Sequence, residues 1–79
     1  MKIRVRFFAS CREAAGKDQM ELTVPSDETV SGILKKVQQD FPGLSLGNVM
    51  VAVNQEFTKP DTKLHEGDEV AFIPPVSGG

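Results

Sequence analysis

The sequence predicts a two-layer α+β domain, in which one main helix covers one face of a mixed sheet of four to five strands. Two observations predict this class. Several short segments alternate apolar and polar residues with a period of two, and one longer segment repeats its apolar residues at helical spacing. A third observation is the length of 79 residues, which leaves room for only one hydrophobic core.

The first part of the chain predicts two strands joined by a helical turn. Period-two alternation covers residues 2–8 and residues 19–24. The Ala-rich segment between them, residues 11–16, closes on Gly16, which is typical of a helical turn with a glycine cap. Pro25 ends the second strand, so this part of the chain predicts an N-terminal hairpin.

The strongest helix signal spans residues 30–41. Its apolar residues recur at i, i+3, i+4, i+7 and i+11 and form one stripe: Val30, Ile33, Leu34, Val37 and Phe41. Residues 26–29 offer N-capping side chains, and residues 42–43 (Pro-Gly) stop the helix. Gly32, in the first turn, is unfavourable for a helix and would allow a close approach to the sheet.

Residues 49–53 predict a third strand, residues 54–56 a turn, and Phe57 the start of a short return segment. A polar loop then leads to the last strand, residues 69–73. A hairpin, a crossover helix and a last strand paired beside the first give the β-grasp arrangement. The predicted core is Ile3, Val5, Phe7, Met20, Leu22, Val24, Val30, Ile33, Leu34, Val37, Val51, Val53, Val70 and Phe72.

Composition excludes several classes of function. Charged residues at 25% and apolar residues at 39% are typical of a soluble globular domain, and no apolar run suits a membrane helix or a signal peptide. We therefore expect a cytoplasmic protein. The net charge of −2 disfavours nucleic acid as the main partner. The basic stripe Lys2, Arg4 and Arg6 is equally well explained as a solvated strand that resists aggregation.

The sequence offers no self-contained active site. Cys11 is the single cysteine, so no internal disulfide is possible, and we interpret it as a small structural or surface residue. His65, also single, lies in a polar loop without the further ligands that a metal site needs. No phosphate-binding loop and no Ser/His/Asp set is visible.

Three large apolar residues remain outside the predicted core. Phe8 points opposite to Phe7, Ile73 points opposite to Phe72, and Phe57 opens the short return segment. If the first and last strands are neighbours, Phe8 and Ile73 lie close together on the sheet face away from the helix. A cluster of this kind indicates a protein–protein contact. Phe57 could instead plug one end of the core.

The sequence ends in Pro74-Pro75-Val76-Ser77-Gly78-Gly79, which predicts an extended tail (residues 74–79) after a domain of residues 1–73. The prolines cannot continue a central strand, and the small residues after them could thread a narrow channel. The α-carboxylate of Gly79 is anionic at neutral pH and needs activation before it can react. Activated, it would accept an amine or sulfide, so we expect a carrier. Chance would produce a Gly-Gly end in roughly one sequence in two hundred, and a cloning boundary is a further alternative.

Four motifs point to a family: Phe7-Phe8-Ala9 followed by Arg12-Glu13 and Gly16, then Val53-Asn54-Gln55, Gly67-Asp68-Glu69-Val70-Ala71-Phe72, and Pro74-Pro75-Val76-Ser77-Gly78-Gly79. Over its whole length the chain resembles the small subunits of molybdopterin synthase, which are ubiquitin-like sulfur carriers. The Gly-Gly end alone is shared with ubiquitin-like proteins generally. Its combination with Gly-Asp-Glu-Val and Pro-Pro-Val is much more specific.

The resemblance implies a non-catalytic subunit that binds no cofactor or metal. An ATP-dependent adenylating enzyme of the E1 type would convert Gly79 to an acyl-adenylate. Sulfur from a persulfide, supplied by a sulfurtransferase or cysteine desulfurase, would then give a thiocarboxylate. The tail, Pro75, Val76, Ser77 and Gly78, would insert into the large synthase subunit, where Gly79 donates sulfur to cyclic pyranopterin monophosphate. Two transfers build the dithiolene that holds molybdenum. Such complexes are heterotetramers, and Phe8, Phe57 and Ile73 match their apolar contact positions.

Two rival functions stay open. A sulfur carrier of thiamine-thiazole synthesis would use the same chemistry, although such chains are shorter and lack the Phe-Phe-Ala…Arg-Glu start. A ubiquitin-like protein modifier would instead join Gly79 to lysines through isopeptide bonds.

Overall fold

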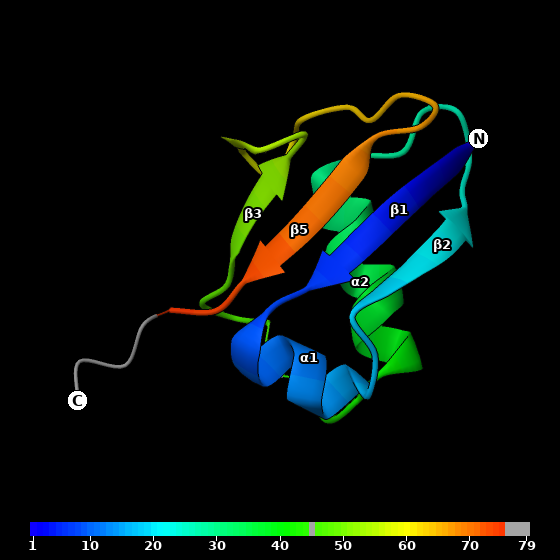
Figure 1. Cartoon of the computed structure of the whole chain (residues 1–79). Coiled ribbons are helices and arrows are strands. Elements are labelled where there is room, and N and C mark those ends of the chain that lie inside the picture. The colour runs from blue at the N-terminus through cyan, green and yellow to red at the C-terminus, as the bar shows by residue number, and fades with distance from the viewer. Residues whose placement is uncertain (45, 76–79) are drawn as a thin grey trace.

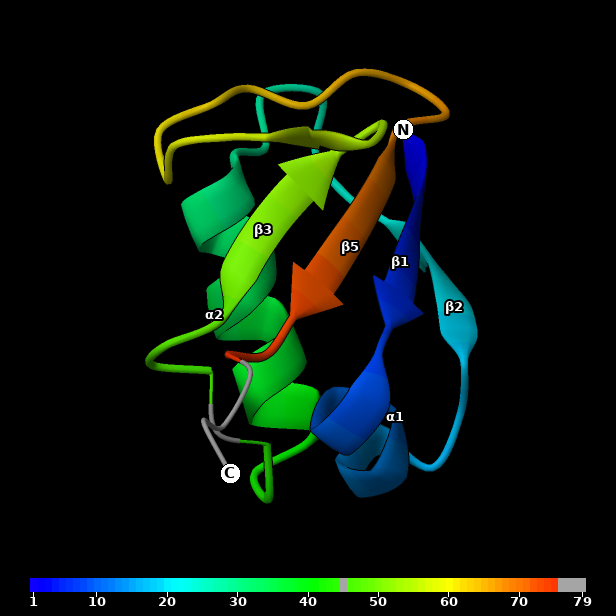
Figure 2. The same cartoon turned by 60° about the vertical axis from the view of Figure 1, so that its left-hand side comes forward.

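The computed structural model describes residues 1–44 and 46–75 (Figure 1). Its elements are β1 (Lys2–Phe7), α1 (Ala9–Ala15), β2 (Gln19–Thr23), α2 (Val30–Asp40), β3 (Met50–Val53), β4 (Glu56–Phe57) and β5 (Glu69–Ile73). The strands form one sheet in the order β2-β1-β5-β3-β4. Figure 2 shows α2 lying across one face of this sheet, while no helix of the described residues covers the other face.

The sheet is mixed, with β5 at its centre between β1 and β3. β1 pairs with β2 antiparallel and with β5 parallel, and β3 pairs antiparallel with both β5 and β4. The last strand therefore lies beside the first, and the predicted β-grasp arrangement is confirmed. The sheet has five strands, the upper of the two predicted numbers.

The N-terminal part differs from the prediction at several boundaries, and β2 ends at Thr23, one residue before the predicted end. β1 ends at Phe7, and Phe8 is the N-cap residue of α1 with an extended backbone, so the predicted strand is one residue too long. α1 is a helix of seven residues that begins at Ala9, two residues before the predicted turn. Gly16 caps it as predicted: its φ is 76°, and its N–H donates to the carbonyl of Arg12.

The core forms between α2 and the sheet face beneath it. All predicted core residues are buried except Met20 and Leu34, which are half-buried and pack against the others. The prediction missed Leu44 and Leu64, which are buried from loops, and Cys11, which is buried from α1. Isolated apolar residues outside a periodic segment carry no sequence signal for burial, because the tertiary fold decides which loops close over the core.

Three carbonyl or hydroxyl oxygens cap the start of α2. Thr29 is the N-cap, and its hydroxyl accepts a hydrogen bond from the Gly32 N–H at 3.2 Å. The N–H groups of Val30 and Ser31 donate to carbonyls of the loop after β4, at 3.0 and 2.9 Å. The expectation that Gly32 allows a close approach of the helix to the sheet is not confirmed. A Cβ at Gly32 would overlap the carboxylate of Glu28, which folds over this helix end.

Candidate functional site

The uncovered face of the sheet carries the large apolar side chains that the core does not use. The register places Met50 of β3 opposite Ile73 of β5, and Ala52 between Ala71 of β5 and Phe57 of β4. Directly opposed side chains of paired strands lie about 4.5–5.5 Å apart, so these residues form one surface. We call Phe8, Met50, Phe57 and Ile73 the outer apolar patch.

The patch is open to solvent. Phe57 is 64% exposed, Met50 51% and Phe8 37%, while Ile73 is half-buried. The alternative that Phe57 plugs one end of the core is wrong, because β4 pairs it across from Ala52 on the face away from α2. Exposed apolar side chains gathered in this way are typical of a protein contact.

Met50 is the member of the patch that the sequence reasoning missed. Successive residues of a strand point to opposite faces, so the periodicity that placed Val51 and Val53 in the core also predicts an outward position for Met50. Its contact with Ile73 was not readable, because it depends on how β3 and β5 pair.

Phe8 joins the patch through Arg6. Phe7 and Phe72 are register partners, so Phe8 and Ile73 follow them at the same end of neighbouring strands. The Arg6 guanidinium lies 5.1 Å from the centroid of the Phe8 ring. Since Arg6 projects from the uncovered face of β1, this contact places the Phe8 ring on the same face.

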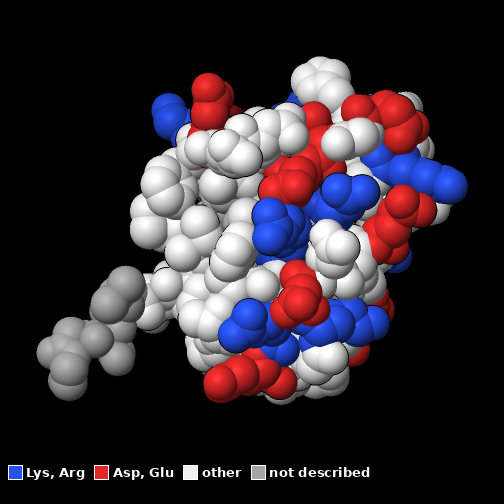
Figure 3. Space-filling view, viewed as in Figure 1, with Lys and Arg blue, Asp and Glu red and all other residues white. Residues whose placement is uncertain are grey.

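The rest of the uncovered face is charged. Arg6 also pairs with Glu69 at 3.4 Å, and Lys2 with Glu21 at 3.8 Å. Figure 3 shows Lys, Arg, Asp and Glu gathered over β1 and β2, and uncharged side chains over β3 and the end of β5. Exposed ion pairs of this kind add little stability. Their effect is to confine the apolar surface to one half of the sheet.

Two of the motifs that carried the resemblance meet at the other end of β3 and β5. The Asn54 side-chain amide donates to Asp68 at 2.9 Å, and its oxygen accepts from the Glu69 N–H at 3.0 Å. Asn54 and Gln55 have positive φ values of 51° and 73°, as the tight turn between β3 and β4 requires. These hydrogen bonds fix the turn between β3 and β4 to the start of β5. Since Phe57 follows this turn in β4, they also help to position Phe57.

The patch lies where the tail begins. β5 ends at Ile73, and the last described residues, Pro74 and Pro75, line a shallow hollow with Ser10 and Asn48. The predicted insertion residues Val76, Ser77 and Gly78 and the predicted sulfur donor Gly79 lie outside the described residues. Of the two described tail residues, Pro74 is half-buried and Pro75 is exposed.

Cys11 and His65 are the remaining candidate residues. Burial raises the pKa of the Cys11 thiol, which disfavours the reactive thiolate. The His65 side chain is 84% exposed, and its Nδ1 lies 3.8 Å from Asp68. Among residues 1–44 and 46–75, no group of three or more potential metal ligands is present. No helix in this described part is long and apolar enough to cross a membrane.

Solved structures of similar proteins share this architecture. A Pyrococcus furiosus protein described as a molybdopterin converting factor, subunit 1, superposes with a TM-score of 0.87 at 28% identity, covering 96% of this chain and 99% of the other. A subunit from the complex of subunits 1 and 2 of the Helicobacter pylori molybdopterin-converting factor gives 0.72 at 28% identity, with both chains fully covered.

Curated relatives are similar over nearly their whole length. The molybdopterin synthase sulfur carrier subunit of Escherichia coli K12 is 42% identical, covering 98% of this chain and 99% of the relative. Small archaeal modifier protein 3 of Haloferax volcanii is 34% identical, with both chains fully covered. The model of the ThiS family matches residues 5–79. The chain belongs to the ThiS family, whose β-grasp architecture it shares.

Proposed function

We propose that this chain is the sulfur carrier subunit of a molybdopterin synthase and acts in molybdenum cofactor biosynthesis. Full-length similarity to curated sulfur carrier subunits supports the proposal. The structural observation that carries it is the position of the outer apolar patch at the end of β5, from which Pro74 and Pro75 leave the sheet. A partner that covers the patch is therefore placed to receive the residues that follow Pro75.

In this proposal the chemistry takes place on the carboxylate of Gly79. The carboxylate is anionic at neutral pH and a poor electrophile, so an E1-like enzyme must first join it to AMP at the expense of ATP. The terminal sulfur of an enzyme persulfide, on a sulfurtransferase or cysteine desulfurase, then displaces AMP and forms an acyl disulfide. A second thiol cleaves the S–S bond of this intermediate, forms a disulfide with the enzyme cysteine and releases the thiocarboxylate. The thiocarboxylate donates its sulfur to cyclic pyranopterin monophosphate in the large subunit.

The chain itself acts as a carrier in this scheme, in the cytoplasm. Residues 1–73 form the domain that the partners grip, and residues 74–79 form the arm that carries sulfur. The large subunit would bury Phe8, Phe57 and Ile73, with Met50 between them, and two such pairs would make a heterotetramer. The Helicobacter pylori complex of subunits 1 and 2 supports a partner of this kind.

Intact-mass measurement tests the proposal directly. The chain is incubated with the adenylating enzyme, ATP and a persulfide source, and replacement of one oxygen by sulfur at Gly79 is expected. Addition of the large subunit and cyclic pyranopterin monophosphate should return the carboxylate and form molybdopterin. A chain that acquires sulfur but never transfers it to the pterin would contradict the proposal and favour the thiazole pathway.

A protein modifier is the second candidate, because the Haloferax volcanii modifier is 34% identical over the full length. In that case Gly79 would form isopeptide bonds with lysines of other proteins. Affinity purification from cells separates the two functions: a pterin-binding large subunit supports the synthase, and a ladder of covalently modified proteins supports conjugation.

A further inference from the structure

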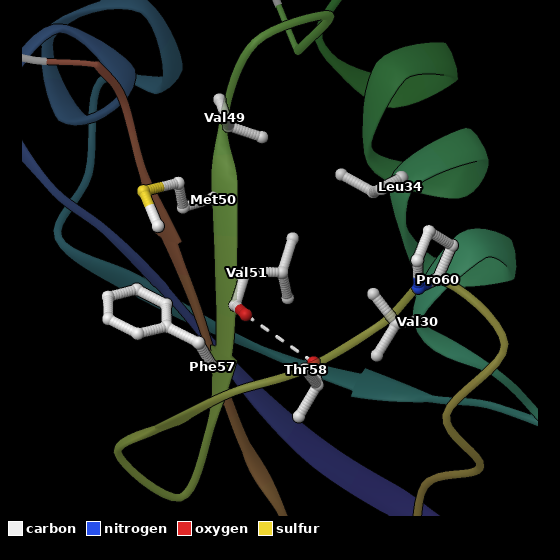
Figure 4. Close-up of a pocket in the computed structure, with 8 residues that line it drawn as sticks. All are labelled: Val30, Leu34, Val49, Met50, Val51, Phe57, Thr58 and Pro60. Atoms are coloured by element: carbon white, nitrogen blue, oxygen red, sulfur yellow. Dashed lines mark hydrogen bonds between the residues drawn. The ribbon is translucent and has the colours of Figure 1, made fainter.

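An apolar groove of about 220 Å³ lies between β3 and α2. Figure 4 shows Val51 of β3 and Leu34 of α2 pointing toward each other across it, with Pro60 beside the helix. Met50 and Phe57 also line the groove and belong to the outer apolar patch. The groove is therefore continuous with the surface proposed to bind the large subunit.

The groove exists because β4 is only two residues long. Phe57 is the last residue of β4 and pairs with Ala52. The chain then turns toward α2, where the carbonyl of Pro60 accepts a hydrogen bond from the Ser31 N–H at 2.9 Å. The chain thus leaves β3 for the helix end after Thr58, and β4 pairs only with Ala52 and Val53. Among the described residues, no strand pairs with Met50 and Val51 on this side of β3.

This side of β3 presents a backbone donor without a strand partner. The Val51 carbonyl faces it, because it accepts hydrogen bonds from the N–H and the hydroxyl of Thr58 at 3.0 and 3.4 Å. The N–H and C=O of one residue in an antiparallel strand point to the same side, so the Val51 N–H faces the groove as well. Within the described residues, the segment after β4 provides no hydrogen bond to the Val51 N–H.

We propose that an extended apolar segment of the large synthase subunit adds to this edge of β3. Its backbone accepts the hydrogen bond from the Val51 N–H, and one large apolar side chain fills the groove. The inference rests on the proposed function, since it assigns a second contact to the same partner.

Three features select this occupant. The open Val51 N–H calls for a backbone acceptor running along the strand, which is how peptides add to sheet edges. The lining residues carry no charge, so the entering side chain is apolar. A cavity of about 150 Å³ accommodates a benzene molecule, so the volume suits one aromatic or aliphatic side chain.

Hydrogen exchange of the Val51 amide tests the inference with the unaltered chain. The amide exchange rate is measured by NMR for the chain alone and in complex with the large subunit. We expect exchange at Val51 to slow by roughly tenfold or more in the complex, equivalent to about 1.4 kcal/mol of added protection. Unchanged exchange at Val51, in a complex that covers Phe57, overturns the inference and leaves the proposed function intact. Failure to form any complex overturns both.

A substitution in the wall of the groove provides the second test. Leu34→Lys places a charge in the groove without touching the uncovered face of the sheet, and Gln39→Lys adds the same charge to an exposed position of α2. We expect the Kd for the large subunit to rise roughly tenfold for Leu34→Lys relative to Gln39→Lys. Equal Kd values for two folded variants overturn the inference, and the exchange measurement decides the question if Leu34→Lys does not fold.

Discussion

Phe57→Ala tests whether the outer apolar patch binds a partner or stabilises the domain. Phe57 is 64% exposed, so the fold removes only about a third of it from water. A buried aromatic side chain covers about 150–250 Å² and contributes on the order of 25 cal/mol per Å². A third of that area corresponds to about 1–2 kcal/mol, which is an upper value because unfolded chains also bury apolar surface. We expect the free energy of unfolding to fall by about 1 kcal/mol.

Phe72→Ala is the matched control for a core position. Phe72 is fully buried, and its ring meets that of Phe7 edge to face with centroids 6.0 Å apart. Removing a buried Phe side chain costs about 3–5 kcal/mol, because it leaves a cavity as well as losing buried area. Measured by urea-induced unfolding, the loss in the free energy of unfolding should therefore be severalfold larger for Phe72→Ala than for Phe57→Ala, although the same atoms are removed.

Binding to the large subunit should show the opposite order. Among chains that remain folded, Phe57→Ala should raise the Kd more than Phe72→Ala does. An aromatic residue at the centre of an interface contributes about 2 kcal/mol or more, so we expect Phe57→Ala to raise the Kd for the large subunit roughly thirtyfold. Isothermal titration calorimetry measures this directly. A Kd equal to that of the unaltered chain would refute the assignment of the patch, and a loss of stability as large as that of Phe72→Ala would refute the exposed placement of Phe57.

Four further predictions follow from the tail, the patch, the turn and the core. Deleting Gly79, or adding one residue after it, should abolish sulfur transfer without changing thermal unfolding; an extended chain with full activity would falsify the terminal-carboxylate mechanism. Phe8→Asp should weaken binding to the large subunit, and a substantial loss of stability would instead make Phe8 a core residue. Asn54→Gly keeps the positive φ but removes the bonds to Asp68 and the next backbone N–H, so the free energy of unfolding should fall by about 1–2 kcal/mol in urea; no change would show that the turn alone suffices. Because burial raises the pKa of Cys11, the folded chain keeps its thiol proton at pH values where the unfolded chain loses it, so stability should decline as the pH rises above the ordinary thiol pKa. Cys11→Ser should remove this decline, and an identical pH profile in both chains would exclude the thiol as its cause.

Local patterns were sufficient to predict the elements of this fold. Alternation at residues 2–7 and helical spacing at residues 30–40 each bring apolar side chains to one face, whatever the rest of the chain does. Gly16 was predicted to cap the first helix because glycine adopts a positive φ without steric cost. The last strand was placed beside the first because the order of hairpin, crossover helix and final strand is typical of the β-grasp arrangement.

Positions outside periodic segments could not be predicted in this way. Leu44 and Leu64 lie in polar loops, and they are buried because those loops cross open parts of the core. The end of β1 at Phe7 was missed because Phe8 continues the alternation while its backbone already serves as the cap of α1. Boundaries depend on such competition between neighbouring elements, which a single segment does not reveal.

The sequence by itself determined that apolar side chains would be left over and that the chain would leave the sheet at two prolines. Side-chain alternation and the missing N–H of proline are properties of the local chain, so they hold in any packing. The tertiary structure alone decided that Met50, Phe57 and Ile73 form one surface and that a groove opens beside Val51. The surface arises from the register of β3 with its neighbouring strands. The groove arises because the chain after β4 hydrogen-bonds to the start of α2. Both depend on contacts between residues distant in sequence.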